Sequence, residues 1–430
     1  MIVAKLQPHD PNSSIWRWAA GRAFLLTLQL GFMLFAGLWA QAQTLTVLYA
    51  FKGHGDGMFP SGVVFRESTG TLYDVTFRGG SFDYGTVFAV DAHRKETVLH
   101  SFWGGDGANP ETALIQDDSG NLYGTTYDGG ALEGGNCVHG CGTVFKLDKT
   151  GKLTVLYAFS GGADGGNPAA GLIRDREGNL YGTTTDGGDL GCTGSGYGCG
   201  VVFKLDSNGN ETVLHAFADW PGDGAQPSGG LIRDKAGNFY GVTTYGGASQ
   251  AADWGTVYKL DPTGKETLLY SFTGGTDGGM PDGTLVRDAE GNLYGVADIN
   301  GDPRCQCGVV FKVDMTGKET VLYSFQGSPN GSQPLGGVIR DSVGNLYGAT
   351  QFGGSGSGCG SLGCGIVFKL DTSGNETVLH SFTEGSDGAF PGGLALDKSG
   401  NLYGNAANGG GSSCGRYAQS GCGVVFKLTP

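Results

Sequence analysis

One short pattern recurs seven times along the chain, and this repeat limits the fold more than any other feature. A tyrosine that follows Leu or Phe recurs at spacings of 50, 58, 59, 54, 53 and 56 residues, at Tyr73, Tyr123, Tyr181, Tyr240, Tyr294, Tyr347 and Tyr403. Two other runs keep the same phase: Gly-x-Val-Phe-Lys-Leu-Asp, as at 142–148, and Glu-Thr-Val-Leu-Tyr/His-x-Phe, as at 96–102. Self-similarity at such a period indicates a repeat architecture in which each unit is one supersecondary element.

Every repeat contains four β-rich runs, which we name A to D in chain order. In the second repeat they are residues 113–116, 122–127, 143–147 and 153–159, joined by hairpin-length Asp-x-x-Gly connections. Four antiparallel strands per unit of roughly 40–60 residues are typical of a propeller blade. We therefore expect an all-β fold, a seven-bladed β-propeller of four-stranded antiparallel blades. The expected units are 60–102, 110–159, 168–217, 227–272, 281–325, 334–382, and 391–428 together with 44–51.

The phase of the two ends predicts a closed ring. The repeats begin with a lone D run at 45–51 and finish with a C run at 424–428 that has no D run after it. Pairing the first strand with the last blade would remove an exposed sheet edge, so we expect the N-terminal strand to complete that blade. The alternative is that both ends stay unpaired.

Residues 1–42 have the layout of a secretory signal peptide. Lys5, Arg17 and Arg22 precede the apolar run 23–40, and Ala40-Gln41-Ala42 offers small residues for cleavage. We expect a mature chain, 43–430, that is a single propeller, with an uncleaved membrane anchor as the alternative. No later run is long and apolar enough to span a bilayer. The sequence thus predicts a secreted, periplasmic or cell-surface protein.

The charge balance argues against nucleic acid as a partner. Residues 43–430 hold 24 basic and 40 acidic side chains, a net charge of −16, and such a surface repels phosphate backbones. The 84 glycines recur at fixed offsets between the apolar runs, so they indicate turns rather than disorder.

Ten cysteines form five neighbouring pairs, all between runs B and C. They are Cys137/Cys141, Cys192/Cys199, Cys305/Cys307, Cys359/Cys364 and Cys414/Cys422. Behind a signal peptide we expect five local disulfides, with zinc at Cys137-x-His139-x-Cys141 as the alternative. The second cysteine always precedes the glycine that opens run C, and Tyr84 and Trp254 fill this place in the other two repeats. We interpret the position as a plug at the base of the loop, and we expect no metal and no cofactor.

The connection from run D to the next run A carries a recurrent Asp-Gly. Its acidic residues are Asp56, Asp106, Asp164, Asp223, Asp277 and Asp387, with Asn330 in the sixth repeat. A ring of carboxylates around one axis could bind calcium, but each loop supplies one carboxylate and calcium requires six to eight oxygens. Asx-turn chemistry explains the motif without a ligand.

The repeat resembles the GloVer tandem-repeat family, also called choice-of-anchor proteins. The resemblance covers residues 44–428 and rests on the joint spacing of Leu-Tyr-Gly, Gly-Thr-Val-Phe and Gly-Gly-x-Asp-Gly-x-x-Pro. It implies an exported bacterial β-propeller without an established activity.

The variable loops are the place where the sequence predicts function. In a propeller the D–A and B–C connections share one face, and this face carries the sequence variation, whereas the other face consists of similar short hairpins. We therefore take as candidate ligand-binding residues Trp220, Asp223, Trp254, Arg304 and Arg416.

The preferred hypothesis is a monomeric, non-catalytic binding or scaffold module whose partner is a glycan or a surface protein. The alternative is an extracellular polysaccharide lyase or hydrolase with its site on the loop-rich face, and a purely structural envelope protein is a third possibility. An enzyme would interrupt the repeat near the axis. The sequence shows only single departures, Asp74 in place of glycine and Ala297-Asp298 in place of Thr126-Tyr127, so we predict no catalytic residue.

Overall fold

The structure is a computed structural model that describes residues 43–62, 65–66, 68–130, 137–192, 197–219, 222–248, 253–356, 358–411, 413–414 and 421–429. All of these residues except Gln43 belong to the compact unit Thr44–Pro430. The predicted signal segment 1–42 and the candidate residues Trp220 and Arg416 lie outside the described residues.

The described residues form small antiparallel β-sheets, as the repeat predicts. Five sheets stand separately. Repeat one has β2 (Met58–Pro60) and β3 (Phe65–Arg66), both paired with β4 (Leu72–Arg78), then β5 (Thr86–Val90) and β6 (Glu96–Ser101). Repeat two has β7 (Ile115–Gln116), β8 (Leu122–Thr126), β9 (Thr143–Leu147) and β10 (Leu153–Ala158). Repeat three has β11 (Ile173–Arg174), β12 (Leu180–Thr184), β13 (Val201–Leu205) and β14 (Glu211–Ala216). Repeat four has β16 (Ile232–Arg233), β17 (Phe239–Thr243), β19 (Thr256–Leu260) and β20 (Glu266–Ser271). The fifth sheet has β29 (Ala389–Leu396), β30 (Leu402–Asn408), β31 (Val424–Thr429) and β1 (Thr44–Ala50).

Repeats five and six share one eight-stranded sheet, so the expectation of seven separate sheets is wrong. Its strands are β21 (Gly279–Arg287), β22 (Leu293–Ile299), β23 (Val309–Val313), β24 (Glu319–Ser324), β25 (Ser332–Arg340), β26 (Leu346–Phe352), β27 (Ile366–Leu370) and β28 (Glu376–Ser381). The two halves meet through a single parallel pair, Thr284 with Gly337. They come this close because the contact lacks side chains: a Cβ on Gly283 would lie 2.1 Å from the Gly337 nitrogen.

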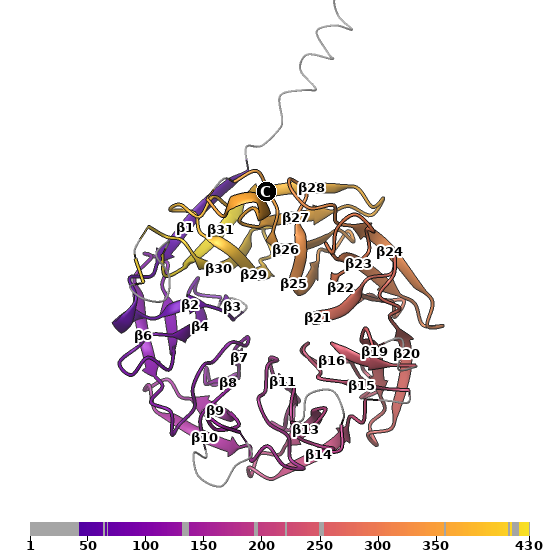
Figure 1. Ribbon diagram of the computed structural model, residues 1–430. Coiled ribbons are helices and arrows are strands. Elements are labelled where there is room, and N and C mark those ends of the chain that lie inside the picture. The colour runs from indigo at the N-terminus through magenta and orange to yellow at the C-terminus, as the bar shows by residue number, and fades with distance from the viewer. Residues whose placement is uncertain are drawn as a thin grey trace, which may run out of the picture. The chain divides into compact units, whose positions relative to one another are not determined.

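The sheets are arranged like the blades of a propeller (Figure 1), with the A strands inside and the D strands at the rim. A two-stranded sheet of β15 (Asp223–Ala225) and β18 (Tyr245–Gly247) lies outside this pattern, and η1 (His54–Asp56) and η2 (Gly360–Leu362) are single 3₁₀ turns. Within the described ranges, no helix has the length and apolar character needed to cross a membrane.

Aromatic rings hold consecutive repeats together. The phenylalanine that ends each D run packs against a C-strand ring of the next repeat, with ring centroids 5.0 to 5.3 Å apart. The pairs are Phe51–Phe88, Phe102–Phe145, Phe159–Phe203, Phe217–Tyr258, Phe272–Phe311, Phe325–Phe368 and Phe382–Phe426. Such pairs add about 0.5–1.5 kcal/mol each beyond the burial of their surface.

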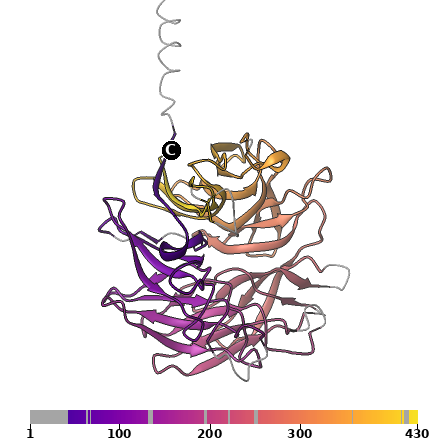
Figure 2. The ribbon, with the colours of Figure 1, turned by 60° about the vertical axis from the view of Figure 1, so that its left-hand side comes forward.

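The predicted closure by the first strand is confirmed. β1 pairs antiparallel with β31, from Thr44 opposite Thr429 to Ala50 opposite Val424, and Figure 2 shows the indigo first strand beside the yellow end of the chain. Phe51 is fully buried against the first repeat. The strand therefore satisfies the open edge of β31 and joins the last repeat to the first.

All five predicted cysteine pairs are disulfides within their own loops, and the described residues contain no free cysteine. The Cα atoms of each pair lie 5.2 to 5.7 Å apart. The bridges are Cys137–Cys141, Cys192–Cys199, Cys305–Cys307, Cys359–Cys364 and Cys414–Cys422. The first of these bridges excludes the zinc alternative at Cys137 and Cys141.

Cys422, at the plug position of the last repeat, also contacts the first repeat. Its side chain is fully buried in a cluster that contains Met58 and Phe88. Its carbonyl accepts the Phe59 N–H at 2.9 Å. Cys422 therefore packs at the junction between the last and first repeats, because ring closure brings the first repeat, more than 300 residues away in sequence, against this loop.

The Asp-Gly loops lie at the rim and not around the axis. Each carboxylate accepts a backbone N–H from its own loop, as Asp277 does from Thr273 at 2.8 Å. Each also contacts a tyrosine or histidine of the outer strand: Asp277 accepts the Tyr270 hydroxyl at 2.9 Å. These aspartates therefore act as turn residues, and they do not form the ring of axial carboxylates that a calcium site would need.

Candidate functional site

Two of the predicted ligand-binding residues flank one loop. Trp254 is half-buried, and a Cβ on Gly274 would come within 2.4 Å of its indole. Gly274 and Arg304 together line a cavity of about 390 Å³. The exposed guanidinium of Arg304 is 2.5 Å from the Asp302 carboxylate. The structure thus brings Trp254 and Arg304 to the same loop, but Trp254 packs into it and Arg304 is already paired.

Asp223 begins β15 at the rim. Its carboxylate accepts the N–H groups of Ala218 and Gly224 at 3.0 and 2.7 Å and lies 3.3 Å from His215 Nε2. Asp223 is not among the residues that line the cavity beside Arg304.

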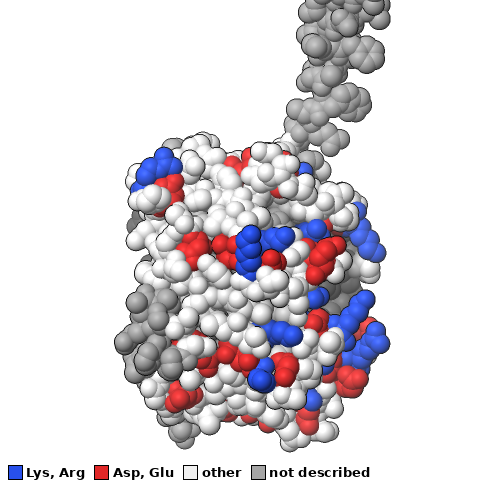
Figure 3. Space-filling view, turned by 90° about the vertical axis from the view of Figure 1, so that its right-hand side faces the viewer, with Lys and Arg blue, Asp and Glu red and all other residues white. Residues whose placement is uncertain are grey.

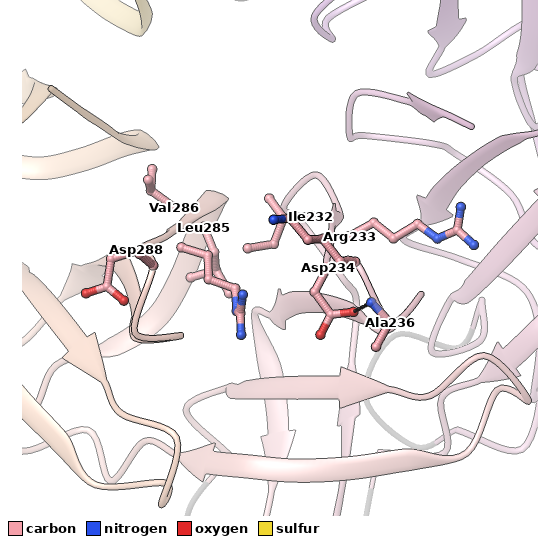
Figure 4. Close-up of a pocket in the computed structure, with 10 residues that line it drawn as sticks. Ile232, Arg233, Asp234, Ala236, Leu285, Val286 and Asp288 are labelled. Carbon is pink, nitrogen blue, oxygen red and sulfur yellow. Dashed lines mark hydrogen bonds between the residues drawn. The ribbon is translucent and has the colours of Figure 1, made fainter. Parts of the chain in front are cut away.

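Another hollow lies on the hairpin face between β16 and β21 (Figure 4). It measures about 810 Å³ and is lined by residues 232–236 and 285–289. Polar groups of this hollow make hydrogen bonds within the hairpins: Asp234 accepts the Ala236 N–H, drawn as a dashed line, and the Tyr240 hydroxyl. The Arg233 guanidinium stacks over the Tyr181 ring at 5.3 Å. We assign these groups to interface packing rather than to ligand binding.

The axial cavity is built by all seven repeats. It measures about 340 Å³, and each repeat contributes a short segment at the start of its inner strand. The residue directly after the repeat's proline reaches this cavity in every case, at Ser61, Glu111, Ala169, Ser228, Asp282, Leu335 and Gly392. Five of these residues are small or apolar, so Glu111 and Asp282 supply the charge.

The residue before this proline has a left-handed backbone in all seven repeats. Its φ lies between 53° and 58° at Phe59, Asn109, Asn167, Gln226, Met280, Gln333 and Phe390. This conformation costs ordinary residues about 1–2 kcal/mol, so other contacts must hold it. In each repeat its N–H donates to the carbonyl of the residue at the predicted plug position, as Asn109 does to Tyr84 and Gln333 to Cys307.

The glycine that follows the plug position packs against the same proline. A Cβ on Gly85 would lie 2.6 Å from Pro110 Cδ, and the other repeats show the same approach. The regular spacing within the repeat therefore has a physical cause: the plug carbonyl, the glycine and the proline together fix how the chain enters the axis. Because the chain enters the axis in this way, the residue after the proline, such as Glu111, lines the axial cavity.

A second cavity of about 300 Å³ adjoins the axial one, because Ser61, Glu111, Leu335 and Gly392 line both. Three phenyl rings contribute to its wall, from Phe59, Phe77 and Phe390. We call the two cavities together the axial mouth. Glu111 lies where they join, so a ligand that enters the mouth meets both aromatic rings and a carboxylate.

Burial and mutual repulsion raise the pKa of the carboxyl groups around the mouth. Burial raises the pKa of Glu111 to about 7, and the Asp128 and Asp282 carboxylates add to the shift. Burial also raises the pKa of Asp282, which accepts the Gly336 N–H at 3.2 Å. The pKa of Asp298 rises to about 7 through burial and then Asp282. Glu111 and Asp282 thus line the axial cavity together, and the Asp282 carboxylate adds to the raised pKa of both Glu111 and Asp298.

The unit-specific Asp74 has a different role. It is fully buried between the first and last repeats, where its carboxylate accepts the Asn405 amide at 2.8 Å. Asn405 also donates to the Gly62 carbonyl. Asp74 is therefore closed off by protein, whereas Asp298, the other single departure, has a buried Oδ1 without a hydrogen-bond partner among the described residues.

Sequence reasoning missed Glu111 and Asp282. The signal that could have found them is positional: only the second and fifth repeats place a carboxylate directly after the proline.

On the side of the molecule drawn in Figure 3, Lys and Arg alternate with Asp and Glu, without a broad basic surface.

Comparison with known proteins gives a family and a fold. The family described as the Gloeobacter/Verrucomicrobia repeat matches residues 38–194 and 190–418. No curated protein sequence matches the chain. Among solved structures, the extracellular domain of a B. thetaiotaomicron protein described as a hybrid two component system superposes with a TM-score of 0.52 and 13% identity, over 90% of this chain and 41% of that chain. A gluconolactonase from Xanthomonas campestris gives a TM-score of 0.43 and 14% identity, over 90% of this chain and 89% of that one. The likeness to the first of these, at 13% identity, shows the fold alone.

Proposed function

We propose that this chain, which belongs to the Gloeobacter/Verrucomicrobia repeat family, is an exported, non-catalytic binding module that takes an amine-bearing glycan into its axial mouth. The observation that supports the proposal is the pair Glu111 and Asp282, which line the same axial cavity. Burial raises the pKa of both carboxyl groups, and repulsion by Asp282 adds to the rise at Glu111. A cationic ligand would relieve this repulsion.

We also propose that the ring has seven blades. The seven aromatic contacts between consecutive repeats support this count. The eight-stranded sheet then counts as two blades, since one residue pair joins its halves.

Export is part of the proposal. Five disulfides fit an oxidising compartment, and the layout of residues 1–42 favours a cleaved signal peptide. The mature protein would then act in the periplasm, at the cell surface or outside the cell.

The chemistry of the mouth suits a sugar that carries an amine. Carboxylates bind ammonium groups and hydroxyls, and the rings of Phe59 and Phe390 can hold the apolar side of a sugar ring or a cation. The guanidinium of Arg78 already lies over the Phe77 ring, 5.7 Å from its centroid. We propose that the loop-face residues contact the outer part of a longer glycan. They are Trp220, Asp223, Trp254, Arg304 and Arg416.

A binding measurement with matched oligosaccharides tests this function. We expect residues 43–430 to bind glucosamine oligomers, and their N-acetylated counterparts at least about tenfold more weakly, in isothermal titration calorimetry. Glu111→Gln and Asp282→Asn should each weaken binding by about tenfold, since charged hydrogen bonds contribute about 1.5–3 kcal/mol. Glu290→Gln removes an equal charge from an exposed residue of the repeat-five hairpin and should leave binding unchanged. Equal binding by all four proteins, or no binding of either oligomer, would refute the proposal.

The pH dependence gives a second readout. Because the pKa of Glu111 is about 7, its ionised fraction rises from about a tenth at pH 6 to about nine tenths at pH 8. The ligand's amine titrates in the same interval but affects both proteins alike, so the ratio of the affinity of the unmodified protein to that of Glu111→Gln should rise by up to about tenfold between pH 6 and pH 8. A ratio that does not change with pH would argue against Glu111 as the binding group.

The raised pKa of Glu111 also favours a second candidate function, a glycan hydrolase. A carboxylic acid that keeps its proton near neutral pH beside a second carboxylate can act as a general acid. Release of new reducing ends from the bound oligomer, abolished by Glu111→Gln, would support catalysis and replace the non-catalytic assignment.

A further inference from the structure

A three-residue contact recurs at the rim between consecutive repeats, and we call it the rim clasp. Its members are the Tyr or His of an outer strand, the Asp or Asn of the loop that follows, and the residue that opens the outer strand of the next repeat. In three clasps a tyrosine donates its hydroxyl to the aspartate, at 2.7 to 3.0 Å, with a glutamate from the next repeat close by: Tyr49–Asp56–Glu96, Tyr157–Asp164–Glu211 and Tyr270–Asp277–Glu319.

Two clasps have histidine but no glutamate. His100 lies 2.7 Å from Asp106, and His380 lies 3.1 Å from Asp387. The opening residue of the next outer strand is then leucine: Leu153 pairs with Leu147, and Leu45 with Leu428, in the register in which other repeats pair a glutamate. In these two clasps one imidazole contacts one carboxylate, and no second carboxylate is present that a metal ion would have to neutralise.

One clasp combines histidine, aspartate and glutamate. His215 Nε2 lies 3.3 Å from both carboxylate oxygens of Asp223, and these two side chains and Glu266 each place a ligand atom within 4.8 Å of the others. The contact is more open than the single short bond of 2.7 Å at His100. The buried Oε1 of Glu266 has no hydrogen-bond partner among the described residues, a feature that the glutamates of the tyrosine clasps share, so the histidine is what distinguishes this clasp from them.

We propose that His215, Asp223 and Glu266 bind a zinc ion that joins the third and fourth repeats. One imidazole nitrogen and two carboxylate oxygens are a ligand set that suits Zn²⁺, with bonds of about 2.0–2.2 Å and water in the fourth position. Ligand atoms within 4.8 Å of one another reach this geometry with small side-chain rotations. The Ala218 and Gly224 N–H groups already orient the Asp223 carboxylate, as outer hydrogen bonds do in zinc sites. His215 and Asp223 are 17% and 15% exposed, so solvent and ion can enter.

The other repeats supply substitutions that the fold already accepts at these positions. His215→Tyr copies the tyrosine clasps, and Glu266→Leu copies Leu153. His380→Tyr makes the same change in a clasp without glutamate and serves as the matched control. We expect residues 43–430 to bind one equivalent of Zn²⁺ in competition with a chromophoric chelator after treatment with EDTA. His215→Tyr and Glu266→Leu should weaken this binding at least tenfold, and His380→Tyr should leave it unchanged.

Two further measurements separate a loss of ligands from a loss of folding. With EDTA the variants should melt within a few degrees of the unmodified protein. Zn²⁺ should raise the melting temperature of the unmodified protein and of His380→Tyr, but not of the two clasp variants. Co²⁺ should give visible d–d bands that vanish in His215→Tyr, while Ca²⁺ should not compete. The proposal is overturned if the unmodified protein binds no zinc, if both clasp variants keep its affinity, or if His380→Tyr loses as much as His215→Tyr.

Discussion

Deleting residues 43–52 from the mature protein is expected to lower its melting temperature by roughly 5–10 °C and to make it associate. β1 is the D strand of the last sheet, and its loss would expose the edge of β31 along six residue pairs. It would also remove Phe51, which is fully buried, and Tyr49, which packs beside it. Burial of such side chains stabilises by about 1.5–3 kcal/mol each, and an unpaired strand edge invites pairing with a second molecule.

Differential scanning calorimetry and light scattering after gel filtration would measure the two effects. The reference is the chain 43–430, which keeps β1. A second variant, Phe51→Ala, keeps the strand but removes the ring that contacts Phe88 at 5.0 Å, so it should lower the melting temperature without promoting association. If the shortened chain melts like the reference and stays at the same size, β1 does not close the ring.

Asn405→Val is expected to destabilise the protein by about 2–4 kcal/mol at pH 8. The substitution leaves the buried Asp74 carboxylate without the amide that donates to it at 2.8 Å, and a buried charge that loses its partner pays its full desolvation cost. Valine itself fits this strand position, since Val242 and Val296 occupy it in other repeats. Chemical denaturation followed by fluorescence would measure the loss.

Asp74 also gives this loss a pH dependence. Burial raises its pKa to about 7 in the folded protein, against 3.8 for a free side chain. Between about pH 4 and pH 7, Asp74 is protonated in the folded state and ionised in the unfolded state. This group therefore makes the stability of the protein fall as the pH rises through that interval. Asn405→Val should therefore cost less at pH 5 than at pH 8.

A double variant provides the control. Asp74→Gly restores the glycine of the other six repeats, so Asp74→Gly with Asn405→Val should recover most of the stability at pH 8. A double variant no more stable than Asn405→Val, or a single variant as stable as the unmodified protein, would show that the Asp74–Asn405 pair is not a buried polar contact of this strength.

The repeat by itself determined the strands, the disulfides and the closure. Each repeat has four β-rich runs joined by hairpin-length turns, and each cysteine has a neighbour close enough for a local bridge. The lone D run 45–51 predicted its distant partner because a four-run repeat that begins with D and ends with C leaves one place open. These features follow from the order of residues along the chain, and the structure agrees with them.

The number of separate sheets and the candidate site depended on the tertiary structure. The sequence does not show that Gly283 and Gly337 approach closely enough for repeats five and six to share a sheet. It places Glu111 and Asp298 in different repeats, 187 positions apart, and only the ring brings both into the surroundings of Asp282. Burial and charge repulsion arise from neighbours in space, and the period of a repeat specifies neighbours along the chain. The pattern could therefore predict the blades, whereas the carboxylates at the axial mouth emerged only when the inner strands met.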